Sequence, residues 1–509
     1  MEFNSILYSN KKIELQLNQP LFFRDLQLDY ILELLNNMSH GYSIDSHFYT
    51  LPCDKEVIRF RREVYGDIMT HSLEKDIQPF CRKMRKAQET FEQCNNGHRG
   101  MKFYSYHLEA AIHYWEGLCF LEEALKDKPL SSQGFLLLKE YVKNSIQRNR
   151  ENGFEEAMRR AQGFFEKIRF QIIVEPEKIS ITEENEDTVD YIAELKDLLS
   201  DYTNEDETGN FLPEFFPNST ECSNIEETLI LLLSKNNPEI FDEIEKFAKK
   251  YVDFMDSKIL RFSEEIQCYF AFYEFQKKTE RLGYFLHMPE IMEGTTFEGQ
   301  GLYDISLVWK SAGRNYEIIS NDFNYSHFPA FFVVTGPNQG GKTTFARSMG
   351  QAIYFALMGF PVNAKQIHMP FFDGLATHFE AEEQMQSNSG KLKEEIERLT
   401  PMMQQEKTNQ FVILNELFTT ATTYDAEIMG KKVMEHFLRA NCCGIYVTHI
   451  QELAEESDSI ISLVAQMEEG SSHRRTYRMI PMKAQGYGYS DSLVNEFELS
   501  YEDIIRRLS

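Results

Sequence analysis

The stretch around residues 331–343 constrains the fold of this chain more than any other. Five residues from Phe331 to Thr335 form a candidate buried strand, because they are apolar or β-branched and a turn signal follows them. The next eight residues read GPNQGGKT, which fits the spacing G-x-x-x-x-G-K-[ST]. Residues 342–358 continue with few helix breakers and predict a helix. A strand, a glycine-rich turn and a helix in this order predict an α/β domain with a largely parallel sheet.

The residue types in this loop suit contact with phosphate groups. Glycines let backbone N–H groups turn toward the β- and γ-phosphates of a nucleotide, and the start of the helix adds its positive end. Lys342 contributes a charge, and Thr343 offers its hydroxyl to Mg²⁺. The sequence therefore predicts ATP and Mg²⁺ as cofactors. The predicted nucleotide-binding residues of the loop are Gly336, Pro337, Asn338, Gln339, Gly340, Gly341, Lys342, Thr343 and Thr344.

Two further strand ends carry the remaining candidate residues. Residues 411–414 lead into Asn415 and Glu416, and we expect Glu416 to orient and activate the attacking water. Asn415 stands where an aspartate normally supports the Mg²⁺ water shell, so Thr343 and Asn415 are the predicted metal ligands. A third apolar run, 444–447, ends near His449, whose imidazole could sense the γ-phosphate. A lone histidine at a strand end is usually structural, but this combination favours a catalytic role for Glu416 and His449.

The chain falls into two parts of different periodicity. Residues 23–35, 54–95 and 100–125 carry apolar residues at three- and four-residue spacing and predict helices. Residues 239–282 show the same stripe without Pro or Gly, which predicts one helix of about 66 Å, suited to a lever or coiled-coil arm. The alternative to a lever is that this apolar stripe only packs against the core and has no mechanical role. We therefore expect a multidomain chain, with a helical region over 1–290 and an α/β domain over 291–509.

The α/β domain is expected to alternate short apolar runs with helices. The runs are ISLVW, AFFVVTG, FVILNEL and GIYVTH, and the helices cover residues 342–358 and 424–440. In the helical region, the sequence near Phe170 has two short alternating runs, which predict a small β element or an extended excursion. An acidic segment follows, so we interpret residues 170–235 as an insertion between helices.

The charge balance disfavours a polyanionic partner without excluding it. Lys and Arg total 53 against 80 Asp and Glu, a net charge of -27, but residues 171–230 alone hold 17 acidic residues against two lysines. Basic clusters remain at 59–62, 82–86 and 159–160, where they could contact phosphates or simply face solvent. A hydrophobic fraction of 42% and the lack of a membrane-length apolar run predict a cytoplasmic protein with no membrane partner. Eight cysteines without a C-x-x-C pair suggest reduced thiols.

The motifs resemble those of the MutS family of DNA-repair ATPases. The loop GPNQGGKTT is similar to the family's GPNMGGKST, and NELFTTATTYDA at 415–426 has the length of DEIGRGTSTYDG. VTHIQEL at 447–453 resembles ATHYHEL, SGKLKE at 389–394 falls where the family has STFMVE, and Ser320-Asn321-Asp322 resembles PND.

This resemblance implies an ABC-type ATPase domain behind an α-helical lever with a reduced clamp. It implies a homodimer with composite ATP sites, in which Ser389 reaches the nucleotide of the partner subunit. Asp425 is assigned to nucleotide binding, and His449 takes the role of a switch histidine. DNA is the implied partner. Departures from the motifs are Asn415 for the acidic metal partner, Phe418 and Thr419 for Gly-Arg, and a signature without its Phe and Met.

Mismatch reading is not expected. No segment before Phe23 could hold the family's mismatch-reading domain, and no nuclease-type extension follows Ser509. Phe272-Tyr273-Glu274 matches the family's Phe-x-Glu wedge, but its position inside a helical stripe favours core packing.

Two functions remain open at this stage. The first is a dimeric clamp that hydrolyses ATP to open and close on DNA without reading mismatches. The second is an ATP-switched protein-interaction module whose acidic insertion docks a basic partner, such as a ribosomal or nucleoid protein. Salt-dependent binding to DNA would separate the two.

Overall fold

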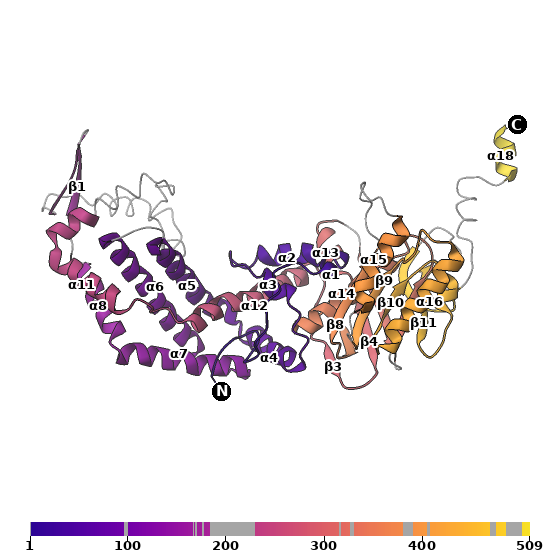
Figure 1. The fold of residues 1–509 in the computed structure, drawn as a ribbon, viewed down its shortest axis with the longest axis horizontal. Helices are drawn as coiled ribbons and strands as arrows, with labels where there is room; N and C mark the ends of the chain where they lie inside the picture. Colours follow the sequence, from indigo (N-terminus) through magenta and orange to yellow (C-terminus); the bar gives the residue numbers. More distant parts are fainter. Residues whose placement is uncertain are drawn as a thin grey trace.

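The molecule is elongated, with a mainly helical part at one end and a part built of two larger sheets and surrounding helices at the other (Figure 1). The computed structural model describes residues 2–95, 100–165, 167, 170–175, 178–183, 230–314, 317–325, 330–379, 390–404, 408–468, 475–484 and 501–508. Within these ranges, no helix has both the length and the apolar character needed to cross a lipid bilayer.

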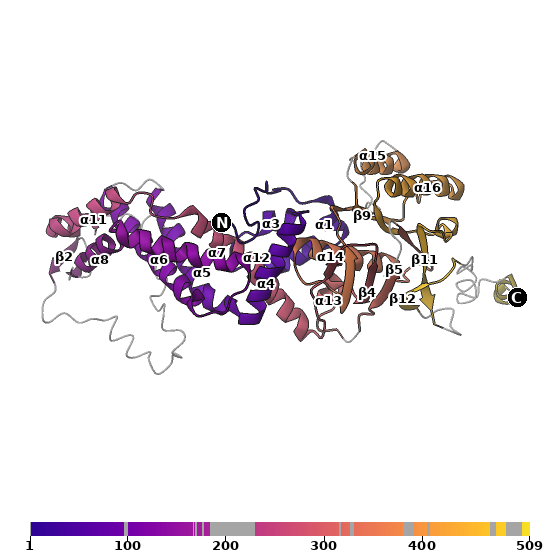
Figure 2. The ribbon, with the colours of Figure 1, turned by 90° about the horizontal axis from the view of Figure 1, so that it is seen from below.

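The helical part precedes the two larger sheets in the chain. Its elements are α1 (Leu21–Asp25), α2 (Leu28–Asn36), α3 (Asp45–Tyr49), α4 (Lys55–His71), α5 (Leu73–Asn95), α6 (Met101–Lys126), α7 (Gln133–Glu151), α8 (Phe154–Phe165), β1 (Phe170–Glu175), β2 (Lys178–Glu183), α11 (Pro238–Lys250) and α12 (Ser257–Arg281). The predicted β element is confirmed, since β1 and β2 pair as an antiparallel hairpin. It lies at the far end of the molecule from the sheets (Figures 1 and 2). The acidic segment that follows it lies outside the described residues.

The prediction of a single helix over 239–282 is wrong. The chain leaves the helical conformation after Lys250 and re-enters it at Ser257. Asp256 caps the second helix, because its carboxylate accepts a hydrogen bond from the Lys258 N–H at 2.8 Å. The apolar stripe hid this break, since Tyr251 and Phe254 within the break still pack against Phe154.

Two other predicted helices are also divided. Residues 23–35 form α1 and α2 with Gln27 between them at φ 55°, and residues 54–95 form α4 and α5 with Ser72 between them at φ 50°. Both residues adopt the left-handed conformation without being glycine, so no residue type marked the breaks. By contrast, α6 lies where residues 100–125 predicted it.

The second part contains two sheets and the helices around them. Its elements are β3 (Glu290–Met292), β4 (Phe297–Leu302), α13 (Ile305–Lys310), β5 (Asn321–Tyr325), β6 (Phe331–Thr335), α14 (Lys342–Met358), β7 (Gln366–Pro370), β8 (Gly374–Phe379), α15 (Lys391–Gln404), β9 (Gln410–Asn415), α16 (Thr423–Arg439), β10 (Cys443–Val447), η1 (Gln451–Ala454), β11 (Ile460–Met467), β12 (Arg475–Pro481) and α18 (Tyr501–Leu508). One sheet has the order β12-β11-β6-β10-β9-β8 and the other the order β3-β7-β4-β5.

The larger sheet is parallel except for its edge strand β12, as the sequence predicted. Its central strands β6, β9 and β10 are buried along their whole length, which explains why they read as uninterrupted apolar runs. The run ISLVW is an exception to the predicted pattern. It forms α13 and not a strand, because Asp304 accepts a hydrogen bond from the Leu307 N–H at 3.1 Å and starts a helix there.

Aromatic packing joins the two parts around Phe272 of α12. Its side chain is fully buried, and its ring stacks on Phe360 with the centroids 4.2 Å apart and meets Phe355 edge-on at 5.2 Å. Glu274 pairs with Lys277 and Lys278, each at 3.4 Å. Both residues of the wedge-like string therefore serve the local structure of α12, in agreement with the packing interpretation.

Replacing Phe272 should destabilise the whole molecule. Phe272→Ala leaves a cavity between α12 and α14, and we expect it to lower the free energy of unfolding by about 3–5 kcal/mol in urea denaturation followed by circular dichroism. Phe120→Ala is the matched control, because Phe120 is 46% exposed and its loss should cost well under half as much. Equal effects of the two substitutions would contradict this assignment of the core.

Candidate functional site

The glycine-rich loop connects β6 to α14, and its backbone adopts conformations that favour glycine. Gly336 and Gly341 have φ of 122° and 91°, in a range that side chains rarely adopt. A Cβ at Gly336 would also lie 2.9 Å from the Cβ of Ala465 on β11. The loop therefore lies close against β11, and α14 begins directly after it at Lys342. The free N–H groups and positive end of a helix at this point suit an anion.

Lys342 places its ammonium group inside this loop. Its Nζ donates hydrogen bonds to the carbonyl oxygens of Gly336 at 2.9 Å and Pro337 at 3.2 Å, and the residue is 4% exposed. Burial lowers the pKa of Lys342, while the nearby charge of Glu416 acts in the opposite direction. No carboxylate among the described residues lies within ion-pair distance of this ammonium group. An anionic ligand would supply the missing negative charge.

Thr343 and Asn415 meet where the loop passes the end of β9. The Thr343 hydroxyl donates a hydrogen bond to the Asn415 side-chain oxygen at 3.0 Å. The two residues predicted to hold Mg²⁺ are thus side by side, each with an oxygen ligand of the kind that Mg²⁺ prefers. Their chemistry fits the metal, although neither supplies a negative charge.

Glu416 follows β9 in a strained backbone conformation. Its φ is 54°, a left-handed value that costs a non-glycine residue about 1 kcal/mol or more, and its N–H donates to the Val447 carbonyl at 2.8 Å. The carboxylate lies 3.1 Å from Nε2 of His449. This hydrogen bond is the main cause of a lowered pKa for Glu416; burial opposes it, and Lys342 supports it. The carboxylate is therefore held ionised at neutral pH beside the loop.

Lys342, Thr343 and Glu416 line one cavity of about 520 Å³. At the end formed by the glycine-rich loop and the end of β9, its lining residues are Asn338, Gln339, Gly340, Gly341, Lys342, Thr343, Thr344 and Glu416. Its other end is formed by residues that the sequence did not identify as site residues. They include Tyr303, Asp304, Leu307, Ile318, Ile319 and Tyr477.

Tyr477 comes to the cavity from β12, far along the chain. Asn321 holds this strand in place, because its side chain donates to the Tyr477 carbonyl at 3.2 Å and accepts from the Met479 N–H at 2.7 Å. The Tyr477 ring lies next to Gly341 and is 48% exposed. An aromatic ring and Ile318 at this end suit a flat apolar group. No local signal marks Tyr477, since only the pairing of β12 brings it there.

Asp304 forms a fixed wall of the same cavity. Its carboxylate pairs with Arg347 of α14 at 2.5 Å and accepts hydrogen bonds from Ser306 and Gln351. Because its side chain is fully buried and these partners occupy it, Asp304 acts as a support of the cavity.

Several predicted site residues do not line this cavity, namely Gly336, Pro337, Asn415, His449 and Asp425. Ser389 lies outside the described residues. Asp425 is at the start of α16, where its N–H and its carboxylate both engage the Thr422 hydroxyl, at 3.2 and 2.7 Å, and it does not line the cavity. Its observed contacts are those of a helix cap.

A strand, a glycine-rich loop and a helix, with a second strand that ends in Asn415 and Glu416, belong to one α/β domain. Residues 332–485 match the family model MutS domain V. This part of the chain is thus of the MutS family, as its motifs implied. It is similar to the DNA mismatch repair protein MutS of Streptococcus pyogenes serotype M1, with 27% identity over 149 residues that cover 29% of this chain and 18% of that protein. The protein of the same name from serotype M5 (strain Manfredo) matches to the same extent. The chain thus spans under a fifth of the length of these relatives.

Removing His449 should raise the pKa of Glu416. His449→Ala deletes the hydrogen bond that favours the ionised carboxylate, so the pKa should move up toward its ordinary value of about 4.3. A ¹³C NMR titration of the Glu416 carboxyl would measure this change. His436→Ala on α16 is the control, since His436 contacts the neighbouring Phe437 ring. An unchanged Glu416 pKa in His449→Ala would show that the contact has no electrostatic effect.

Proposed function

We propose that this chain is an ATPase of the MutS type that binds ATP with Mg²⁺ in the P-loop cavity. The observation that carries the proposal is the convergence of Lys342, Thr343 and Glu416 on one cavity from two separate strand ends, with Asn415 hydrogen-bonded to Thr343. ATP supplies the bond to be broken, and Mg²⁺ balances charge on its phosphates. In this proposal the loop amides and Lys342 hold the triphosphate, and Thr343 and Asn415 hold the metal.

The base of ATP would occupy the apolar end of the cavity. Tyr477 offers a ring face there, and Ile318 lies in the same lining. An apolar end beside a phosphate-binding end agrees with the usual make-up of cofactor sites, in which a few polar groups fix orientation.

Glu416 is the group we assign to water activation. Its carboxylate stays ionised because His449 donates to it, and a carboxylate can accept a proton from an attacking water. His449 is therefore assigned a positioning role, which includes sensing the γ-phosphate through Glu416. Asn415 gives the metal no negative charge, so we propose weak Mg²⁺ affinity and slow hydrolysis, with long-lived ATP-bound states.

We also propose different roles for the two parts of the chain. Residues 1–290 would form the lever with a reduced clamp, and residues 291–509 the ABC-type ATPase domain. A homodimer with composite ATP sites is supported by exposed apolar side chains on α15 and α16, where Tyr424 is 71% exposed and Ile396 43%. By resemblance, Ser389 would complete the site of the partner subunit.

DNA is the proposed partner, since the relatives are DNA mismatch repair proteins by name. Mismatch reading through Phe272 is disfavoured, because its ring is fully buried. Because ATP and DNA are the proposed ligands, we also propose a cytoplasmic location. The alternative function is a protein-interaction module, because the acidic residues 171–230 could dock a basic protein partner.

Two substitutions should separate ATP binding from ATP hydrolysis. Lys342→Ala removes the charge in the loop and should weaken Mg-ATP binding about tenfold to a hundredfold by isothermal titration calorimetry. Glu416→Gln should retain that affinity and lose about a hundredfold or more in turnover. Lys365→Ala and Glu455→Gln are exposed controls in the same part of the chain. Unchanged affinity in Lys342→Ala would refute the P-loop assignment, and surviving turnover in Glu416→Gln would refute the role of that carboxylate.

Binding to DNA should depend steeply on salt and not on mispairs. We expect ATP-loaded protein to bind a fluorescent duplex weakly in anisotropy measurements, with affinity falling as salt rises from low to moderate concentration. A duplex with one mispair should bind equally well. The absence of binding to duplex and branched DNA at low salt would support the protein-interaction alternative, and strong mispair selectivity would overturn the assignment of Phe272.

A further inference from the structure

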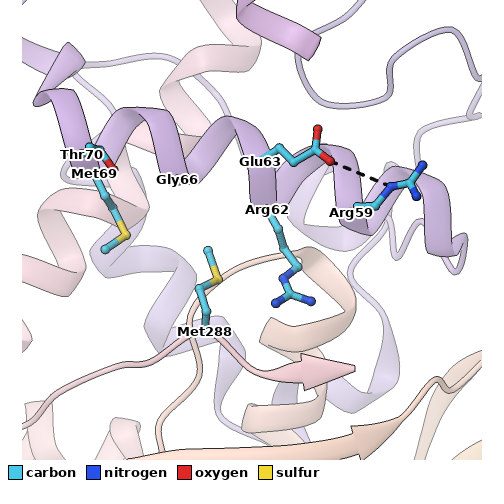
Figure 3. Close-up of a pocket in the computed structure, with 7 residues that line it drawn as sticks. All are labelled: Arg59, Arg62, Glu63, Gly66, Met69, Thr70 and Met288. Carbon is cyan, nitrogen blue, oxygen red and sulfur yellow. Dashed lines mark ion pairs between the residues drawn. The ribbon is translucent and has the colours of Figure 1, made fainter. Parts of the chain in front are cut away.

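A second pocket, of about 490 Å³, lies on one face of α4 (Figure 3). Arg59, Arg62, Gly66 and Met69 line it from successive turns of this helix, and Met288 lines it from the connector between α12 and β3. It shares no lining residue with the P-loop cavity. Its volume falls within the range of small-molecule sites, about 300–1,000 Å³.

Gly66 leaves space in this pocket, although neither its backbone conformation nor its packing requires a glycine. It lies inside α4 with no positive φ, and a Cβ built on it would meet no heavy atom within 4 Å. Gly117 and Gly134 are helical glycines of another kind, since a Cβ there would lie 2.2 Å from Met84 and 2.6 Å from Val64. A glycine inside a helix costs about 0.8–1.0 kcal/mol relative to alanine. At Gly66 packing does not explain this cost, and the result of the glycine is open space beside Arg62.

Arg62 points from α4 toward the connector that carries Met288 (Figure 3). It is half-buried, and among the described residues its guanidinium makes no hydrogen bond or ion pair. Its neighbours differ, because Arg59 lies 3.9 Å from Glu63 and Arg61 donates to the Leu7 and Met358 carbonyls. The five donors of a guanidinium fit a carboxylate or phosphate, and part burial strengthens such a contact.

The carboxylate that acts on Arg62 from a distance is itself paired with another residue. Burial lowers the pKa of the guanidinium, and Glu290 opposes this effect from a distance. The Glu290 carboxylate itself lies 3.3 Å from Nε2 of His368, so it is engaged elsewhere. Arg62 is thus the cation of this pocket that a ligand would satisfy.

The rest of the lining contains Thr70, Glu63, which pairs with Arg59, and two methionines. Met69 extends into it from α4 and Met288 from the connector, so their thioethers lie on the side away from Arg59 (Figure 3). Methionine side chains are flexible and polarisable, which lets them fit apolar groups of different shapes. A ligand here would contact an anion-binding group at one end and methionines at the other.

We propose that this pocket binds a small amphiphilic anion, with one carboxylate or phosphate on Arg62 and a short apolar body over Met69 and Met288. The connector that carries Met288 leads from α12 to β3. The ligand therefore bridges the helical part and the sheet part and stabilises their junction. This site is independent of the proposed ATPase activity.

The test uses octanoate, octyl phosphate and octanol as probes of the full-length chain labelled with [methyl-¹³C]methionine. The methyl signals of Met69 and Met288 are assigned through the corresponding leucine substitutions. Both anions should shift these two signals in a saturable manner, and octanol should bind at least about tenfold more weakly, since it cannot pair with a guanidinium. Saturation by only one anion also supports the site and identifies its preferred headgroup.

Matched variants distinguish the pocket from general surface binding. Arg62→Gln should weaken octanoate binding about tenfold or more, and Gly66→Leu should abolish it by filling the space. Arg59→Gln and Gly163→Leu are the controls, because Arg59 pairs with Glu63 and Gly163 of α8 also has open space above it but lines no pocket described here. Thermal melting of each variant checks that it is folded. Equal affinity for octanol, no saturable shift with either anion, or unimpaired binding in folded Gly66→Leu would overturn the proposal.

Discussion

The pairing of β10 with both β6 and β9 is the constraint on which the site depends. Val447 at the end of β10 is level with Val334 on one side and with Asn415 on the other. The three strand ends therefore meet at one edge of the sheet, and each continues into a functional segment. Gly444 permits this close pairing, because a Cβ there would lie 1.8 Å from the Val412 carbonyl oxygen. A shift of one residue in either register would separate Thr343 from Asn415 and Glu416 from His449.

Helix α14 connects this edge to the rest of the molecule. It begins in the site with Lys342, and at its other end the Met358 carbonyl accepts a hydrogen bond from Arg61 of α4 at 3.3 Å. Along its length, Gln351 donates to the Leu26 carbonyl at the α1–α2 junction. A packed helix with such contacts at both ends is a direct physical link between the cavity and the helical part. ATP-dependent motion of the helical part would have to be transmitted through contacts of this kind.

Sequence patterns predicted the elements of the sheet part better than the continuity of the helices. Glycine and the buried apolar runs have local effects, so the loop after Thr335 and the helix after Lys342 could be placed within a residue. The breaks at Gln27, at Ser72 and after Lys250 could not, because no glycine or proline marks them and apolar residues continue across them. ISLVW was misread since a short apolar run fits a strand or a buried helix equally well, and only the Asp304 cap decides between them.

The sequence by itself determined the chemistry of the P-loop. The identities of Lys342, Thr343, Asn415 and Glu416 and their places at strand ends follow from local order along the chain, since each of these segments folds by its own short-range rules. Only the tertiary structure decided which distant residues meet: His449 and Glu416, Tyr477 and Gly341, and Arg62 and Met288. These contacts join residues far apart in the chain, and they depend on strand order and on how α4 packs against the connector. Such non-local contacts form when the shared core is buried as a whole. The local periodicity of the sequence therefore cannot predict them.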